Sequence, residues 1–261
     1  MKHLSLCLCG LLMFMLSAAT LKAESAIEGL SPLMILVQAR SMFPQEQLQV
    51  TGTLETAEAR GLNAVIRPYT LSLNWHQGSP SATCAIFDDA DRQSPVQRAL
   101  LKRENGITHL TLFNAEGVQN ENVRLNTPVA DTDLTWMDLT FNYLWWTNVQ
   151  QLSEAALEAR ALKARQGGRN CVVLEAFPPK GTIGLHSVLL WIDISTGYLV
   201  QTEQTDAHQR AVRRMWVQRI GREEGRWVPR EFRIQREGMR RVTKLIIATI
   251  QSEAFSVKEL N

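Results

Sequence analysis

The chain has 261 residues, of which 45% are hydrophobic and 21% are charged, and its formal net charge is +2. Beyond the first residues, no apolar run reaches the roughly 20 residues that a helix needs to cross a bilayer, which excludes a second membrane-spanning helix. The length suits one large domain or two small ones.

The first 23 residues have the three parts of a secretory signal peptide. Lys2 and His3 give a charged start, an apolar run covers residues 4–16, and small residues lead to Ala23. We expect cleavage after Ala23, which leaves 238 residues (261 minus 23), and export to the periplasm. An uncleaved anchor or a buried first helix is the alternative. Loss of Lys2 and Lys22 takes Lys plus Arg from 28 to 26, equal to the 26 Asp plus Glu, so the predicted mature chain has no net charge.

Two cysteines, Cys84 and Cys171, belong to the predicted mature chain. An oxidising compartment would allow them to form one disulfide. Two separate buried thiols are an equally open alternative, because a buried cysteine behaves as a small hydrophobic residue. Neither alternative makes them catalytic.

The beginning of the predicted mature chain combines a helix with a long series of strands. Ser31 followed by Pro32 predicts a helix start, because serine caps helices and proline suits their first position. From residue 44 to about residue 125, apolar residues recur at every second position and turn-forming residues separate the runs. This pattern predicts an antiparallel meander.

Residues 131–146, DTDLTWMDLTFNYLWW, interrupt this meander. Thr135 followed three residues later by Asp138 predicts a capped helix start. The apolar residues that recur at helical spacing are Trp136, Leu139, Tyr143 and Trp146. A helix that is apolar on most sides must be covered by protein or by a ligand.

A second helix is expected over residues 147–166, ended by Gly167 and Gly168. The remainder consists of strand patterns joined by short turns. Such an up-and-down sheet must curl or be plugged to hide its apolar face. We therefore expect one mainly β (α+β) domain over residues 24–261, in which helices fill the concavity of a single curled sheet.

Two motifs resemble the outer membrane lipoprotein-sorting protein family, the relatives of the periplasmic lipoprotein carrier LolA. The first is TDLTWMDLT, which matches the family at Thr132, Asp133, Thr135, Trp136, Asp138 and Leu139. The second is WIDISTGYLVQTE, which matches a strand-turn-strand unit of the family. Asp131 stands where the family usually has glycine, and Met137 where it has an acidic residue. These variants are closest to an uncharacterised branch of the family.

The resemblance implies a strongly curved antiparallel sheet, an incomplete β-barrel with helices covering its concave face around an apolar cavity. It implies a carrier or chaperone that receives the acyl chains of lipoproteins, or other lipids, from an inner-membrane donor and passes them to an outer-membrane acceptor. It also implies a monomer without catalysis, cofactor or metal. The alternative is a periplasmic sensor, like the relatives that bind an anti-sigma factor.

Six residues of the aromatic segment are candidate lipid contacts: Leu134, Trp136, Leu139, Tyr143, Leu144 and Trp146. The alternative is that they only fill the core, because apolar pockets and packed cores have the same composition. Asp133 and Asp138 stand at a helix start, which favours capping over acid–base catalysis.

Residues 207–244 contain twelve Arg or Lys and four acidic residues. Because side chains alternate along a strand, Phe232 and Ile234 are expected to face the core while Arg233 and Gln235 face outward. Most of these charges are therefore predicted to form a solvated face. Transient contact with anionic lipid headgroups is the second interpretation, and export argues against nucleic acid.

Overall fold

The computed structural model describes residues 26–43, 47–58, 64–75, 80–88, 93–120, 123–182, 184–223 and 226–252. The predicted signal peptide, residues 1–23, lies outside these ranges. Within them, no helix has both the length and the apolar character needed to cross a membrane.

One antiparallel sheet contains every described strand, in the order β6-β5-β4-β3-β2-β1-β14-β13-β12-β11-β10-β9-β7, with β8 paired to β9. Its first half comprises β1 (Leu48–Ala57), β2 (Val65–Asn74), β3 (Ser81–Ile86), β4 (Gln97–Glu104), β5 (Ile107–Asn114) and β6 (Gln119–Asn120). Its second half comprises β7 (Val149–Gln151), β8 (Arg165–Gln166), β9 (Arg169–Ala176), β10 (Ser187–Asp193), β11 (Leu199–Thr205), β12 (Ala211–Glu223), β13 (Arg226–Arg236) and β14 (Val242–Ser252). The sheet is not closed, and it confirms the predicted fold class.

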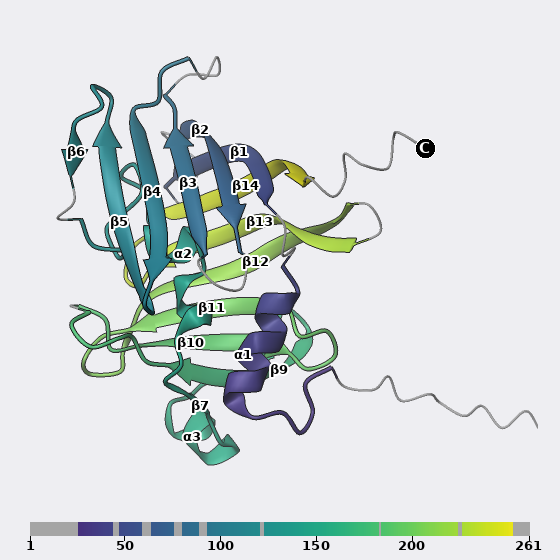
Figure 1. The fold of residues 1–261 in the computed structure, drawn as a ribbon. Coiled ribbons are helices and arrows are strands. Elements are labelled where there is room, and N and C mark those ends of the chain that lie inside the picture. Colours follow the sequence, from purple (N-terminus) through teal and green to yellow (C-terminus); the bar gives the residue numbers. More distant parts are fainter. Residues whose placement is uncertain are drawn as a thin grey trace, which may run out of the picture.

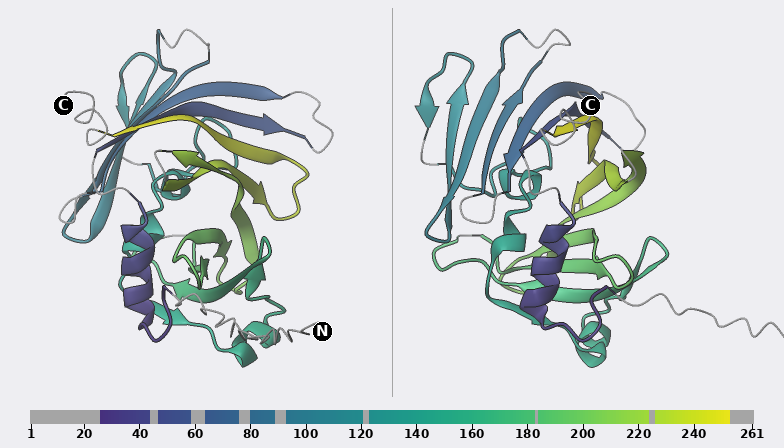
Figure 2. Two further views of the ribbon diagram at one scale, coloured as in Figure 1. Left: turned by 90° about the vertical axis from the view of Figure 1, so that its right-hand side faces the viewer. Right: turned by 45° about the vertical axis from the view of Figure 1, so that its right-hand side comes forward.

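The two halves join where β1 pairs with β14, and the sheet curls there (Figure 2). The register of this pair shifts between Thr51 and Gly52. A side chain at position 52 would collide with the carbonyl oxygen of Ile246, so only glycine permits this close approach. A bulge of this kind bends a strand and increases its twist, which helps the sheet to curl.

Helix α1 (Pro32–Ser41) begins where the sequence predicts. The Ser31 hydroxyl accepts a hydrogen bond from the Met34 amide at 3.4 Å. The buried residues of the helix are Ile35, Leu36 and Ala39. Figure 1 shows α1 lying across the second half of the sheet, where it contacts β7 and the 3-10 helix η1 (Asn142–Trp145).

The predicted helix that begins at Thr135 is confirmed at its start but is shorter than its apolar pattern suggests. Helix α2 (Trp136–Leu139) ends after one turn. Phe141 has a φ of 47°, which takes the chain out of the helix before η1 begins. A straight amphipathic helix buries only one apolar stripe of side chains. The change of backbone direction at Phe141 lets apolar side chains on several sides of the segment pack against the surrounding sheet.

The second predicted helix, over residues 147–166, is largely wrong. This region forms β7, the short helix α3 (Glu154–Ala159) and β8. Gly167 and Gly168 have φ values of 55° and 80° and form the turn between β8 and β9 instead of ending a helix. Pairing of β7 and β8 with β9 outweighs the helix propensity of this alanine-rich stretch, because tertiary contacts override local propensity.

Cys84 and Cys171 are both buried and free, so the disulfide alternative is not the arrangement of this structure. Cys84 lies on β3 in the main hydrophobic core, whereas Cys171 lies on β9 in a smaller cluster with Leu157 and Trp191. Strands β2, β1, β14, β13, β12, β11 and β10 separate β3 from β9 in the sheet. The two thiols therefore lie in separate parts of the sheet, each in its own apolar cluster.

Both thiols are expected to resist a thiol reagent in the native mature protein and to react in denaturant. Burial raises the pKa of the Cys84 thiol, and burial together with Asp193 raises the pKa of Cys171 to about 11. The thiolate is the reactive form, so both effects slow the reaction. A colorimetric thiol assay with and without denaturant measures this. Absence of free thiol in the denatured, unreduced protein would contradict it.

The turn between β10 and β11 depends on Asp193. Its carboxylate accepts hydrogen bonds from the Ser195 amide and hydroxyl at 2.8 and 2.7 Å, and it lies 2.6 Å from the Arg169 guanidinium. Burial alone would raise the pKa of this carboxyl group. The bonds from Ser195 and Arg169 outweigh burial and hold the pKa below its ordinary value.

A lowered folded pKa means that the Asp193 carboxylate stabilises the fold above its unfolded pKa of about 3.9. This contribution is lost as the pH falls through the folded value. The difference in unfolding free energy between wild type and Asp193→Asn should therefore be largest near neutral pH and shrink below about pH 4. Urea unfolding at neutral and acidic pH measures the difference, and equal values at both would contradict this account.

Candidate functional site

The aromatic segment lies inside the curled sheet, and we call residues 129–146 the plug. All six candidate lipid contacts are at most 4% exposed: Leu134, Trp136, Leu139, Tyr143, Leu144 and Trp146. They share one hydrophobic core with side chains from both halves of the sheet, such as Leu71 of β2 and Phe232 of β13. The plug thus occupies the space that a ligand on the concave face would need.

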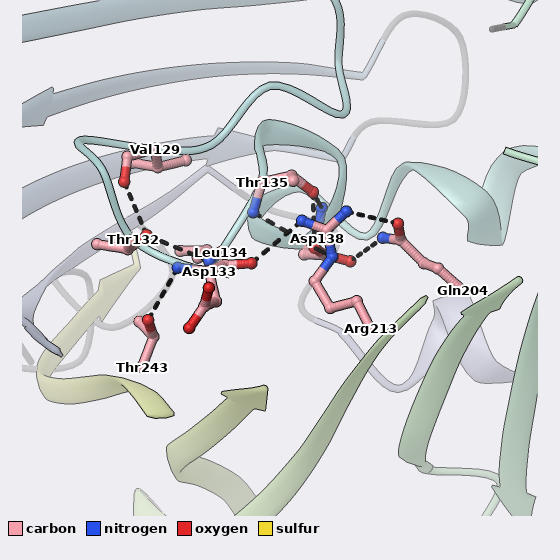
Figure 3. Close-up of polar contacts among 9 residues, drawn as sticks. All are labelled: Val129, Thr132, Asp133, Leu134, Thr135, Asp138, Gln204, Arg213 and Thr243. Carbon is pink, nitrogen blue, oxygen red and sulfur yellow. Dashed lines mark hydrogen bonds and ion pairs between the residues drawn. The ribbon is translucent and has the colours of Figure 1, made fainter. Parts of the chain in front are cut away.

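Asp138 fixes the plug to the second half of the sheet (Figure 3). Its buried carboxylate accepts hydrogen bonds from the Thr135 amide and hydroxyl at 3.3 and 2.6 Å, while its own amide donates to the Thr135 hydroxyl. The predicted capping box is therefore confirmed. Gln204 of β11 donates to the same carboxylate at 2.8 Å, and Arg213 Nε of β12 lies 3.7 Å from it. Asp138 is both a cap and a link to the sheet.

Asp133 makes a second link, and its side chain is fully buried. Its carboxylate accepts hydrogen bonds from Arg241 at 2.9 and 3.3 Å. Its amide donates to the Thr243 hydroxyl at 2.9 Å, and its carbonyl accepts from Arg213 at 3.1 Å. The hydrogen bond to Asp133 raises the pKa of Arg241, which keeps the guanidinium charged. We call the contacts of both aspartates with the second half the clamp; its members are Asp133, Asp138, Gln204, Arg213, Arg241 and Thr243.

The clamp corrects one expectation and confirms another. Phe232 and Ile234 are buried, as the alternation predicts. The expectation of a mostly solvated basic face does not hold for Arg213, whose side chain is only 12% exposed and reaches the plug. Asp133 and Asp138, two of the three aspartates in this apolar segment, gave the signal for such partners, because a buried charge must be paired. The sequence did not show which arginines would supply them.

The plug meets the first half of the sheet along a boundary that we call the seam. Four hydrogen bonds of the described residues cross it: Arg67 to the Ala130 carbonyl (2.7 Å), the Ala130 amide to Gln97 Oε1 (3.2 Å), Arg103 to the Trp145 carbonyl (2.9 Å), and Asn142 to the Thr108 hydroxyl (2.6 Å). No ion pair among the described residues crosses the seam. Arginines donate two of these four bonds, but to neutral carbonyl oxygens, whereas the clamp brings arginines to two carboxylates. The clamp therefore holds the plug more firmly than the seam does.

The plug is held in a conformation that its own residues do not favour. Ala130, Asp131 and Phe141 have φ values of 45°, 59° and 47°. Left-handed backbone costs about 1–3 kcal/mol at a residue other than glycine. Within the described part of the chain, the buried indole nitrogen of Trp136 has no hydrogen-bond partner, which costs a further ~1–3 kcal/mol. The surroundings therefore keep the plug in place.

Two clefts open along the seam. The narrower has a volume of about 20 Å³ and is lined by residues that include Trp75, Leu101, Arg103 and Trp145. The wider has a volume of about 210 Å³ and is lined by residues that include Leu110, Val123, Arg124 and Met137. Thr108 lines both clefts, and its hydrogen-bond partner Asn142 lines the narrower one.

The titratable side chains of the plug that face the sheet, Asp133, Asp138 and Tyr143, are buried. Burial raises the pKa of the Tyr143 hydroxyl well above its ordinary value, and the nearby Asp138 carboxylate adds to this effect, so the phenol stays neutral. Both oxygens of each clamp carboxylate accept hydrogen bonds from protein groups. Fully engaged carboxylates of this kind hold structure together.

Comparison with known proteins places the chain in a family. A family model described as "Uncharacterized protein" matches residues 124–259, which is 136 of the 261 residues and includes the plug and the second half of the sheet. The chain belongs to this family. No curated protein sequence matches it.

Solved structures show the fold. A DUF1329 family protein from Desulfovibrio piger has 13% identity and a TM-score of 0.69, over 85% of this chain and 92% of that one. A protein described as an outer membrane lipoprotein-sorting protein domain, from Vibrio parahaemolyticus, gives the same identity, TM-score and coverage. A LolA superfamily protein from Nitrosomonas europaea has 16% identity and a TM-score of 0.65, over 86% and 94%. The resemblance is thus confirmed at the level of the fold, which is LolA-like.

Proposed function

We propose that this protein is a periplasmic carrier that binds the acyl chains of a lipoprotein or another lipid inside its curled sheet. The observation that carries the proposal is the plug, which fills the concave face with apolar side chains yet is clamped on one side only. In this account the six candidate residues take the place of cargo when the carrier is empty: Leu134, Trp136, Leu139, Tyr143, Leu144 and Trp146.

The size of the clefts supports movement of the plug during binding. A cavity of about 150 Å³ holds a molecule such as benzene. The wider cleft, at about 210 Å³, therefore cannot contain a whole acyl chain. An acyl chain of about 16 carbons would recover on the order of 12 kcal/mol on burial at ~0.8 kcal/mol per methylene. This free energy is large enough to displace a strained plug.

The unequal attachment of the plug indicates where the chain enters. The clamp joins the plug to the second half through buried charges, whereas the four hydrogen bonds of the seam end on neutral oxygens. We infer that the seam opens and that the plug stays with the second half. Release of the bound acyl chain then needs an apolar acceptor. We propose that a monomeric carrier takes the chain from an inner-membrane donor and gives it to an outer-membrane acceptor.

The direct test is mass spectrometry of the mature protein purified gently from the periplasm. The native mass is compared with the denatured mass, and an organic extract is analysed for lipid. A stoichiometric acylated species is expected. A bare protein mass, with no uptake of added acylated lipopeptide or phospholipid, would overturn the proposal.

A matched pair of variants tests the seam. Thr108→Val removes the hydrogen bond with Asn142 while keeping the size of the side chain, and it should speed the uptake of a fluorescent fatty acid. The control is Thr249→Val, which removes an exposed hydroxyl contact with Thr51 between β14 and β1. Equal uptake rates in the two variants would contradict opening at the seam.

A further inference from the structure

We propose that the free end of the β12–β13 hairpin docks on the surface of an anionic lipid bilayer. We call residues 217–223 and 226–230 the ribbon. The proposal goes beyond lipid carriage and does not rest on the plug, because it depends only on the outer surface of this hairpin.

The ribbon extends beyond the rest of the sheet. Strand β11 pairs with β12 only as far as Trp216, and β14 pairs with β13 only from Glu231 to Ile234. Within the ribbon, residues 220–223 pair with residues 226–229. Figure 1 shows this hairpin reaching the right-hand edge of the molecule. Pro229 suits such a place, because proline lacks the amide hydrogen that a neighbouring strand would use.

One face of the ribbon combines apolar and cationic side chains. Ile220 lies opposite Pro229, and Arg222 lies opposite Trp227, so alternation places all four on the same face. Ile220 is 46% exposed and Trp227 is 53% exposed. The Arg222 guanidinium lies 5.7 Å from the centre of the Trp227 ring. The opposite face carries an ion pair between Glu223 and Arg230, so the two faces of the ribbon differ in character.

This combination fits the interface between water and lipid. Tryptophan favours that interface because it has an apolar ring and a polar N–H group, and Trp227 is the one exposed tryptophan among the described residues. Arginine beside it contributes attraction to anionic headgroups. Residues 217–230 contain four arginines and two glutamates, a net charge of +2 on a predicted mature chain with none. An anionic bilayer therefore complements the ribbon in both charge and polarity.

The test is co-sedimentation of the mature protein with vesicles of phosphatidylglycerol and, separately, of phosphatidylcholine. Binding to the anionic vesicles is expected, with weaker binding at high salt and on neutral vesicles. Trp227→Ser should reduce the partition coefficient about tenfold, because it removes most of the apolar contact. Met239→Ser is the matched control: Met239 has the same exposed fraction of 53% and lies in the turn at the other end of β13.

A charge pair completes the test. Arg222→Glu should weaken binding to anionic vesicles several-fold more than Arg240→Glu, which makes the same change in net charge at another exposed position. No binding of wild type to either vesicle, or equal loss in the ribbon variants and their controls, would overturn the proposal and favour a protein partner. Acyl uptake from soluble lipid should be normal in Trp227→Ser, which separates failure of docking from failure of carriage.

Discussion

Replacing Asp138 with alanine is expected to lower the free energy of unfolding by about 3–5 kcal/mol, the range for breaking a buried ion pair by removing one partner. The Asp138 side chain is 1% exposed and accepts hydrogen bonds from Thr135 and Gln204. Its loss removes the carboxylate half of the capping box and leaves the Arg213 guanidinium without its carboxylate. Urea unfolding followed by far-UV circular dichroism measures the change.

Asp88→Ala provides the control for this prediction. Asp88 pairs with Arg67 at 2.9 Å, but its side chain is 61% exposed. An exposed pair contributes about 0–1 kcal/mol, so this variant should unfold close to wild type. If both alanine variants lose the same free energy, the clamp does not anchor the plug as described here.

The sheet was predictable because its signals are local. Alternating apolar residues and turn-formers fix the β meander on each side of the plug, and Ser31 and the Thr135–Asp138 capping box mark their helix starts. The failures concern segments whose conformation depends on distant partners. Residues 147–166 carry a helix pattern, yet β7 and β8 form there because they pair with the edge of β9 that β10 does not use.

Of the candidate site, only the residues of the plug could be predicted from the sequence. Composition and spacing identify Trp136 and Tyr143 as residues that must be covered, but they do not distinguish a packed core from a ligand cavity. Asp133 and Asp138 stand out in an apolar segment. Their partners Arg213 and Arg241 lie far away in the sequence, among many other arginines, and only the curl of the sheet brings them to the plug.

A second large effect is expected for Trp136→Ala, together with a response to ligand. Trp136 is fully buried in the plug, and truncating such a residue costs about 3–5 kcal/mol of unfolding free energy. If the plug takes the place of cargo, the vacated space should accept part of an acyl chain. Lysophosphatidylcholine, added below its micellar concentration, should then restore ~2–3 kcal/mol when present at about 100 times its dissociation constant.

Trp191→Ala distinguishes cargo replacement from simple cavity filling. Trp191 is 1% exposed but belongs to the smaller cluster with Leu157, outside the plug. The two variants should lose similar free energy without lipid, because both remove a buried tryptophan. The lipid should stabilise Trp136→Ala more than Trp191→Ala or wild type, because in the latter two it must first displace an intact plug. Thermal unfolding of both variants and wild type, with and without lipid, measures the difference. Equal recovery of stability in the two variants would mean that the lipid fills any apolar void. The plug would then be part of the hydrophobic core and would not take the place of cargo.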